Sequence, residues 1–300
     1  MKRHVAVLMG GWSAEREVSL VSGAAVANAL SNAGFRVTSI DVQRDTGSLL
    51  TRLYPKPDVV FNALHGRYGE DGCVQGLLNI LAVPYTYSGV LASAIAMDKP
   101  MAKRLMREVG INVADHQIMT REEMASGGVM EAPFVIKPLN EGSSVGVHIV
   151  HEYDSFDPTV ADWRYGETVM VETYIAGREL TVAVLGDRGL AVTEIDTKRR
   201  FYDYEAKYSQ GGSWHQVPAD LPEDVYDEAL RISLLAHETI GCRGVSRVDL
   251  RYDGKDLYML EVNTQPGMTP TSLVPEQAAY MNISFEDLIT WMVEHAACDG

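Results

Sequence analysis

The 300-residue sequence has only three cysteines, Cys73, Cys242 and Cys298, and none of them belongs to a CxxC pair. Their wide spacing argues against a disulfide framework or a thiolate metal site, and it is typical of proteins in a reducing compartment. Basic residues are also few, because 26 Lys and Arg stand against 41 Asp and Glu, which gives a formal net charge of −15. Nucleic-acid-binding proteins usually carry a basic surface, so the composition argues against a nucleic-acid partner.

Long apolar runs are missing as well. No uninterrupted apolar stretch could span a bilayer, and the first residues do not form a basic and apolar leader. We therefore expect a cytoplasmic protein with no membrane partner. The patterns GxGxxG and GxxxxGK[ST] are also absent, so a nucleotide would have to be held by an architecture other than a Rossmann fold or a P-loop.

The first 95 residues alternate between apolar strands and helices. The sequence predicts, in order, elements at 4–9 (strand), 18–31 (helix), 35–42 (strand), 58–65 (strand) and 73–81 (helix). This alternation is typical of a parallel sheet covered by helices. Residues 1–95 are therefore predicted to form an N-terminal α/β lobe.

Beyond residue 95 the pattern favours two α+β lobes. The predicted central lobe, residues 96–180, contains a basic helix and four short strands, at 99–109, 113–119, 134–137, 146–150 and 169–172. The predicted C-terminal lobe, residues 181–300, contains two hairpins and two helices, around 186–189, at 223–240, at 245–263 and at 286–295. Residues 197–217 lack periodicity, and a loop of this length is usually a functional lid or disordered.

The hairpin at 245–263 carries polar residues at alternate positions. Residues two apart in a strand share a face, so Arg247 points with Asp249, and Glu261 points with Asn263. If the two strands pair, one wall presents three oxygen ligands and a guanidinium. Such oxygens suit a hard cation such as magnesium, although a solvated face with ordinary ion pairs is the alternative.

Other segments have residue types that suit a bound nucleotide or substrate. The Gly/Ser-rich stretch 137–146 offers N–H groups and hydroxyls to phosphate, with Lys137 as a point charge at its start. Residues 10–15 follow the first strand, at the edge where parallel sheets bind ligands. The segment 172–179 could hold an adenine or be only a connection, and His65 could be a catalytic base or a structural hydrogen bonder.

Six strings occur in one order along the chain: Gly10-Gly11-x-Ser13-x-Glu15-x-Glu17-Val18-Ser19, Leu64-His65-Gly66 with Gly69-Glu70-Asp71-Gly72, Met97-Asp98-Lys99, Lys137-Pro138 with Gly142-Ser143-Ser144-Val145-Gly146, Phe201-Tyr202-Asp203-Tyr204-Glu205-Ala206-Lys207-Tyr208, and Asn263-Thr264-x-Pro266-Gly267-Met268-Thr269. Together they resemble the D-alanine–D-alanine ligase family of the ATP-grasp superfamily, over essentially the whole chain. Pro100 departs from the pattern, but proline is tolerated in a first helical turn.

The resemblance implies an ATP-grasp fold of three lobes, with ATP as co-substrate between the central and C-terminal lobes. It also implies two Mg²⁺ ions, for which Mn²⁺ is a possible substitute, bound by Asp249, Glu261 and Asn263. The residues that it assigns to ATP are Lys99, Lys137, Glu172, Tyr174, Ile175, Glu179 and Lys207.

For the amino acids, the resemblance implies that Glu15 binds the ammonium group of a first D-alanine, with His65 beside it, and connects through Ser143 to Tyr208 in the lid. Arg247 and the Gly267 N–H would form an oxyanion site, and Ser272 with Leu273 would receive the carboxylate of a second D-alanine. The implied reaction joins the two through an acyl phosphate, with release of ADP and phosphate, for peptidoglycan precursor synthesis.

Three alternatives stay open at this point. A depsipeptide ligase would join D-alanine to D-lactate, although Tyr208 in the lid favours the dipeptide. An enzyme of the glutathione-synthase kind would share the predicted metal ligands but lack the string around Glu15. A nucleotide-binding regulator without catalysis would bind ATP and release no ADP. A homodimer is expected from the resemblance alone.

Overall fold

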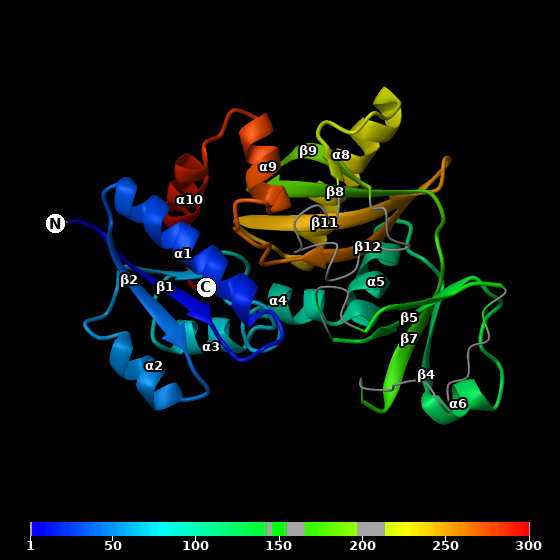
Figure 1. Cartoon of the computed structure of the whole chain (residues 1–300), viewed down its shortest axis with the longest axis horizontal. Coiled ribbons are helices and arrows are strands. Elements are labelled where there is room, and N and C mark those ends of the chain that lie inside the picture. Colours follow the sequence, from blue (N-terminus) through cyan, green and yellow to red (C-terminus); the bar gives the residue numbers. More distant parts are fainter. Residues whose placement is uncertain are drawn as a thin grey trace.

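The structure is a computed structural model that describes residues 2–140, 142, 146–152, 154, 166–196 and 214–299. Three separate sheets organise these residues, one in each of three lobes (Figure 1). We call the lobes the N-lobe, the central lobe and the C-lobe. The positions at which the lobes meet decide where a ligand could bind.

The N-lobe is built on a parallel sheet whose central strand is β1 (His4–Gly10), between β2 (Arg36–Val42) and β3 (Val59–Asn62). Every residue of β1 is buried, as expected for a strand that is covered on both faces. Helices α1 (Arg16–Asn32) and α10 (Phe285–Glu294) cover one face, and α2 (Thr46–Arg52) and α3 (Cys73–Ile80) cover the other (Figure 1). The predicted parallel sheet is confirmed.

Two helices connect the N-lobe to the rest of the chain. Helix α4 (Val90–Met97) leads into α5 (Lys99–Glu108), whose N-cap Asp98 accepts a hydrogen bond from Met101 N at 3.0 Å. Pro100 lies in the first turn of α5, where it removes no helical hydrogen bond. Helix α5 therefore keeps Lys99 at its start despite the proline.

The central lobe is a four-stranded antiparallel sheet with the order β4-β7-β5-β6. Its strands and its short helix α6 are, in chain order, β4 (His116–Thr120), α6 (Arg121–Ala125), β5 (Phe134–Pro138), β6 (His148–Val150) and β7 (Thr168–Thr173). Buried residues of β5 and β7 pack with Met124 of α6 in a core of their own. The central sheet thus forms a separate wall of the molecule (Figure 1).

The C-lobe is a five-stranded antiparallel sheet with the order β10-β9-β8-β11-β12. The elements are β8 (Arg178–Leu185), β9 (Arg188–Asp196), β10 (Trp214–Gln216), α8 (Glu223–Ile240), β11 (Val245–Tyr252), β12 (Leu257–Asn263) and α9 (Leu273–Tyr280). An apolar stripe of α8 packs on the sheet, and Gly241 ends that helix in the left-handed conformation with φ 76°.

The predicted elements are present, with small differences at their ends, and the described residues include four further short helices, α2, α4, α6 and α9. The predicted loop 197–217 is wrong at its end, because Trp214–Gln216 pair with β9 as an edge strand. The remainder of that loop, 197–213, lies outside the described residues. None of the helices in the described part of the chain has both the length and the apolar character needed to cross a bilayer.

Candidate active site

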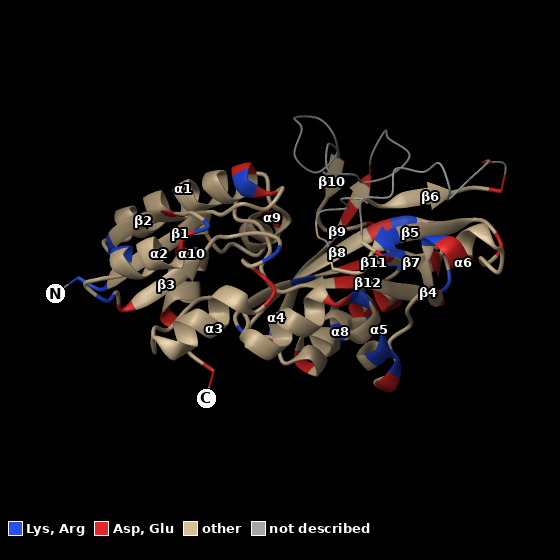
Figure 2. Ribbon diagram, turned by 90° about the horizontal axis from the view of Figure 1, so that it is seen from below, with Lys and Arg blue, Asp and Glu red and all other residues tan. Residues whose placement is uncertain are grey.

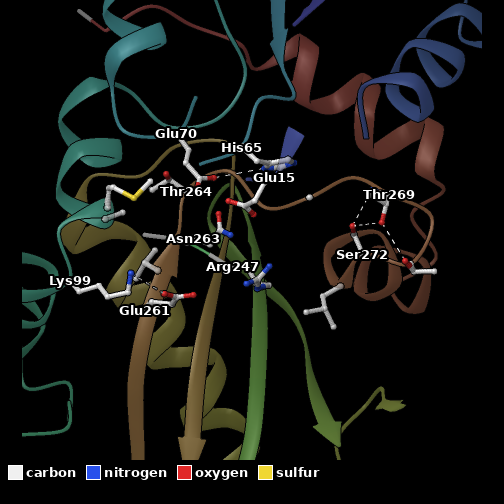
Figure 3. A pocket seen from close by; sticks show the side chains of 17 residues that line it. Glu15, His65, Glu70, Lys99, Arg247, Glu261, Asn263, Thr264, Thr269 and Ser272 are labelled. Carbon is white, nitrogen blue, oxygen red and sulfur yellow. Dashed lines mark hydrogen bonds and ion pairs between the residues drawn. The ribbon is translucent and has the colours of Figure 1, made fainter. Parts of the chain in front are cut away.

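A pocket lies where the three lobes meet, and its lining comes from segments far apart in the sequence (Figure 3). The N-lobe contributes side chains at the start of α1 and after β3, and the C-lobe contributes the ends of β11 and β12 and the loop before α9. Nine predicted site residues line this pocket: Glu15, His65, Lys99, Arg247, Glu261, Asn263, Gly267, Ser272 and Leu273. The fold therefore brings together residues that the sequence separates by more than 250 positions.

The hairpin of β11 and β12 forms the floor of the pocket. Arg247 pairs with Asn263 across the two strands, and Asp249 pairs with Glu261, so all four side chains share one face. Val248 and Val262 between them are buried on the other face, at 0% and 3% exposure. The predicted alternation is confirmed, and an ordinary solvated face is excluded because Arg247 and Asp249 each have side chains only 13% exposed.

Asp249 is held from two sides. Arg247 donates from Nε and Nη2 to the two Asp249 oxygens at 2.8 and 2.7 Å, and Thr181 Oγ1 donates to Asp249 Oδ1 at 2.7 Å. A bidentate guanidinium–carboxylate pair has a fixed geometry, so both side chains are oriented before any ligand arrives. Asp249 is not part of the pocket lining, but it contacts Arg247, which is.

The donor set on this wall suits a hard cation. Two carboxylates and one amide oxygen are the ligand types that magnesium prefers. Among the described residues, no group of three or more His, Cys, Asp or Glu side chains is arranged to hold a metal ion. The set here has only two carboxylates, Asp249 and Glu261, and depends on the amide of Asn263.

A buried cluster of charge lies beside the pocket, between α5 and the central sheet. Lys103 Nζ is 3.0 Å from Glu172 Oε2, and Lys137 Nζ contacts the other oxygen of the same carboxylate. Burial alone would raise the pKa of Glu172, but the two ammonium groups outweigh it and lower that pKa to about 2. Figure 2 shows the basic and acidic segments meeting around β5, β7 and α5.

Lys99, one turn before Lys103 on α5, faces the pocket floor. Its Nζ is 3.9 Å from Glu261 Oε2, and the residue is 7% exposed. Burial lowers the pKa of Lys99, while the Glu261 carboxylate opposes this shift. Lys99 thus places its amino group where an anionic group could be bound next to the oxygen donors.

The segment between the central lobe and the C-lobe is fixed by Arg251 of β11. Its Nε donates to Ile175 O at 3.0 Å, Nη1 contacts Glu179 Oε2 at 3.1 Å, and Nη2 donates to Tyr174 Oη at 3.4 Å. The predicted adenine and ribose residues therefore share a single cationic anchor. The side chain of Glu172, by contrast, points to Lys103 and Lys137, away from this segment.

The N-lobe side of the pocket carries Glu15, His65 and Glu70 (Figure 3). His65 Nδ1 is 3.8 Å from Glu70 Oε2, and the buried His65 Nε2 has no hydrogen-bond partner among the described residues. Burial would lower the pKa of His65, but the Glu70 and Glu15 carboxylates raise it overall. A Cβ added to Gly142 would lie 3.3 Å from both Glu15 Oε2 and Glu70 Oε1, so Gly142 is a close neighbour of these two carboxylates.

The loop before α9 completes the pocket with a helix N-terminus. Ser272, the N-cap of α9, accepts a hydrogen bond from Thr269 N at 2.9 Å, and its Oγ is 2.8 Å from Thr269 Oγ1. A Cβ added to Gly267 would meet Ser272 Oγ at 3.1 Å, so these two residues are close neighbours. Free N–H groups at a helix start suit a carboxylate.

Comparison with known proteins identifies the family of the chain. The family model described as D-ala D-ala ligase C-terminus matches residues 105–294, and the one described as D-ala D-ala ligase N-terminus matches residues 46–88. The chain belongs to the D-alanine–D-alanine ligase family. It is 58% identical over 302 residues to the D-alanine–D-alanine ligase of Rhodospirillum rubrum, with 100% of both chains covered.

Further D-alanine–D-alanine ligases agree with this assignment. The enzyme of Parvibaculum lavamentivorans is 58% identical over 305 residues, which cover 99% of this chain and 98% of that one. The crystal structure of D-alanine–D-alanine ligase from Bacillus anthracis complexed with ATP superimposes with a TM-score of 0.82 at 31% identity, over 98% of this chain and 97% of the other. The predicted D-alanine–D-alanine ligase (ATP-grasp) fold is confirmed.

Not every predicted site residue can be located in this D-alanine–D-alanine ligase family member. Ser143, Lys207 and Tyr208 lie outside the described residues. Lys103 and Arg251 were not predicted. The signal for Lys103 was its spacing, because residues 99, 102, 103 and 106 form one buried stripe of α5. Arg251 continues the alternation of Arg247 and Asp249 along β11, which was a usable signal.

Proposed function

We propose that this chain ligates two D-alanine molecules into D-alanyl-D-alanine at the expense of ATP, in the synthesis of peptidoglycan precursors. The observation that carries the proposal is the pocket itself, in a chain that belongs to this ligase family. There the N-lobe pair Glu15 and His65 faces Arg247 at the end of β11 (Figure 3), and Gly267 lines the same pocket. A site where lobes meet can bind two amino acids next to each other, with the carboxylate of the first facing the amine of the second.

The nucleotide occupies the space between the central lobe and the C-lobe in this proposal. Lys99, Lys137 and Lys207 meet the phosphates, and Arg251 supports the segment Tyr174–Glu179 against adenine and ribose. Glu172 keeps Lys137 in place through their buried contact. Asp249, Glu261 and Asn263 would hold Mg²⁺, which would neutralise charge on the transferring phosphoryl group.

The reaction begins at the carboxylate of the first D-alanine. Glu15 binds its ammonium group, and the raised pKa of His65 favours an imidazolium whose Nε2 can donate to the carboxylate. A carboxylate oxygen attacks the γ-phosphorus, ADP leaves, and an acyl phosphate forms. Glu15 is also assigned, through Ser143, to position Tyr208 of the lid, which shields the acyl phosphate from water.

The second D-alanine then supplies the nucleophile. Its carboxylate is bound by Ser272 and Leu273 at the start of α9, which directs the amine toward the acyl carbon. Attack gives a tetrahedral intermediate whose oxyanion is stabilised by Arg247 and the Gly267 N–H. Cleavage of the carbon–oxygen bond to phosphate yields the dipeptide, and the amine loses its proton.

We also propose a homodimer and a cytoplasmic location. Ile80 on α3 and Leu91 on α4 are 83% and 70% exposed. The residues before them, Asn79 and Val90, bind one carboxylate, that of Asp299, so the two apolar side chains belong to neighbouring segments. Analytical ultracentrifugation tests the dimer, with Ile80→Glu expected to give monomers. The three free cysteines and the use of ATP support a reducing, cytosolic setting.

The experiment is phosphate release from ATP and magnesium by the purified chain with D-alanine, L-alanine, or D-alanine plus D-lactate. Release with D-alanine alone, with the dipeptide found by mass spectrometry, is the expected result. Turnover only when D-lactate is present would replace the proposal with a depsipeptide ligase. ATP binding without ADP formation under every condition would contradict any ligase activity.

A further inference from the structure

A buried network of side-chain amides joins the N-lobe to the loop that carries Asn263 and Gly267. Gln265, in the middle of this loop, accepts at Oε1 from Asn62 Nδ2 at 2.8 Å and from Gln75 Nε2 at 3.4 Å. Asn62, Gln75 and Gln265 are 0%, 1% and 1% exposed. Two buried N-lobe amides thus donate to one buried amide of the C-lobe, which is a specific polar contact between the lobes.

On the N-lobe side the network holds the segment that carries His65. Gln265 Nε2 donates to Leu64 O, the carbonyl immediately before His65. Asn62 and Gln75 both donate to Gly69 O, at 2.9 and 3.0 Å, and Gly69 immediately precedes Glu70. His65 and Glu70 thus each follow a residue whose carbonyl is hydrogen-bonded by the network.

On the C-lobe side the network holds the pocket floor. The Gln265 backbone N–H donates to Asn263 Oδ1 at 2.8 Å, which fixes the rotamer of that amide. The next residue, Pro266, accepts at its carbonyl from Tyr87 Oη of the N-lobe at 3.1 Å. Gly267 follows directly. One residue, Gln265, therefore bonds to both walls of the pocket.

We propose that Gln265 is a positioning residue that keeps His65 and Glu70 of the N-lobe aligned with Asn263 and Gly267 of the C-lobe. The proposal rests on the ligase function, in which the N-lobe wall binds the first D-alanine and the C-lobe wall stabilises the charge that develops on its reacting carboxylate. An amide suits this task because it presents a donor and an acceptor in one plane. If the N-lobe and the C-lobe shifted relative to each other, buried amides would lose their hydrogen-bond partners, which would raise the free energy of the protein.

The kinetic consequence is specific to the amino acids. A misplacement of about 1 Å between reacting groups can reduce a rate about 100-fold. Among the described residues, the side chains predicted to contact phosphate and adenine lie on α5, β5, β7 and the segment after β7, which the network does not touch. Its contact with Asn263 comes from the Gln265 backbone N–H, which a side-chain substitution keeps. Loss of Gln265 should therefore impair the use of D-alanine while leaving ATP binding intact.

The test is Gln265→Met, which keeps the length of the side chain, removes its side-chain hydrogen bonds and leaves the backbone N–H bond to Asn263 in place. We expect kcat/KM for D-alanine to fall about 10- to 100-fold, with the KM for ATP within about twofold of the wild-type value. Gln277→Met is the matched control, because Gln277 is equally buried and its side chain, within the described part of the chain, bonds to Ala183, Thr181 and Thr193 of the C-lobe alone. It should lower the melting temperature with a smaller effect on D-alanine.

A double-mutant cycle with Asn62→Ala separates positioning from general destabilisation. If Asn62 and Gln265 act together, the double variant should have a kcat/KM for D-alanine no lower than that of the worse single variant. Losses that multiply in the double variant would overturn the proposal. If Gln265→Met does not fold, Gln265→Glu is measured in the same way, since its carboxylate still accepts from Asn62 but cannot donate to Leu64 O.

Failure of this inference is distinguishable from failure of the proposed function. Wild-type protein that makes dipeptide, together with a folded Gln265→Met variant of unchanged kcat/KM for D-alanine, would refute only the role of Gln265. Equal losses in Gln265→Met and Gln277→Met would refute it as well. Wild-type protein that makes no dipeptide would refute the ligase function itself.

Discussion

Lys103 offers a quantitative test of the buried charge cluster. Glu172 has a pKa of about 2, below its ordinary value of 4.5, which corresponds to about 3 kcal/mol in favour of the ionised form. Lys103→Met removes one of the two ammonium groups and leaves the carboxylate with Lys137 alone. Removal of one partner from a buried ion pair costs about 3–5 kcal/mol, so we expect the free energy of unfolding to fall by about 3 kcal/mol.

Urea and thermal unfolding measure this change, and a loss of about 3 kcal/mol should lower the melting temperature by roughly 6–12 °C. Lys255→Met is the matched control. Lys255 Nζ forms an ion pair with Asp256 Oδ2 at 3.1 Å, but its side chain is 86% exposed. Exposed pairs contribute about 0–1 kcal/mol. A Lys103→Met variant as stable as Lys255→Met would refute the reasoning.

The pH dependence of the same variant provides a second check. Because the pKa of Glu172 is lowered in the folded state, its contribution is present above the unfolded value and is lost as the pH falls through the folded value. The stability difference between wild type and Lys103→Met should therefore be constant near neutral pH and shrink between pH 4.5 and about 2. A difference that grows on acidification would contradict the ion-pair explanation.

Three further predictions concern the site. Thr181→Val removes a hydrogen bond to Asp249 and should weaken the apparent affinity for Mg²⁺ about 10-fold or more in activity titrations; an unchanged titration would exclude Asp249 as a ligand. The raised pKa of His65 means that its charge is present below pH 6.5 and is lost as the pH rises through the raised value. As the pH rises through the raised value, the KM for D-alanine should therefore increase in the wild type but stay constant in His65→Gln. The same dependence of KM on pH in both proteins would argue against a charged His65. Arg251→Leu, which frees Ile175 O, should raise the KM for ATP more than the KM for D-alanine; the reverse order would contradict its anchoring role.

The hairpin and α8 show what the sequence could predict. Alternation in 245–263 placed Arg247, Asp249, Glu261 and Asn263 on one wall, because strand geometry converts spacing directly into direction. The apolar stripe with Pro222 before it and Gly241 after it predicted α8 with its observed bounds, Glu223–Ile240. Both are local features, and local rules were sufficient.

The residues that were missed depend on contacts between distant segments. Nothing near Glu172 in the sequence indicates that its side chain meets Lys103 of α5, almost 70 positions earlier. Helix α4 is a short, nearly uniform apolar run without helical periodicity, and α9 contains Pro275 in its first turn. Local patterns of this kind fit several structures, and tertiary packing selects one.

An isotope experiment tests the central claim, that the carboxylate is activated as an acyl phosphate, most directly. The chain is incubated with ATP, magnesium and D-alanine labelled with ¹⁸O in its carboxylate, and the released phosphate is analysed by mass spectrometry. In the proposed mechanism the attacking carboxylate oxygen stays with phosphorus when the amine displaces it, so each phosphate should carry one ¹⁸O atom. Dipeptide formed together with unlabelled phosphate would contradict the mechanism.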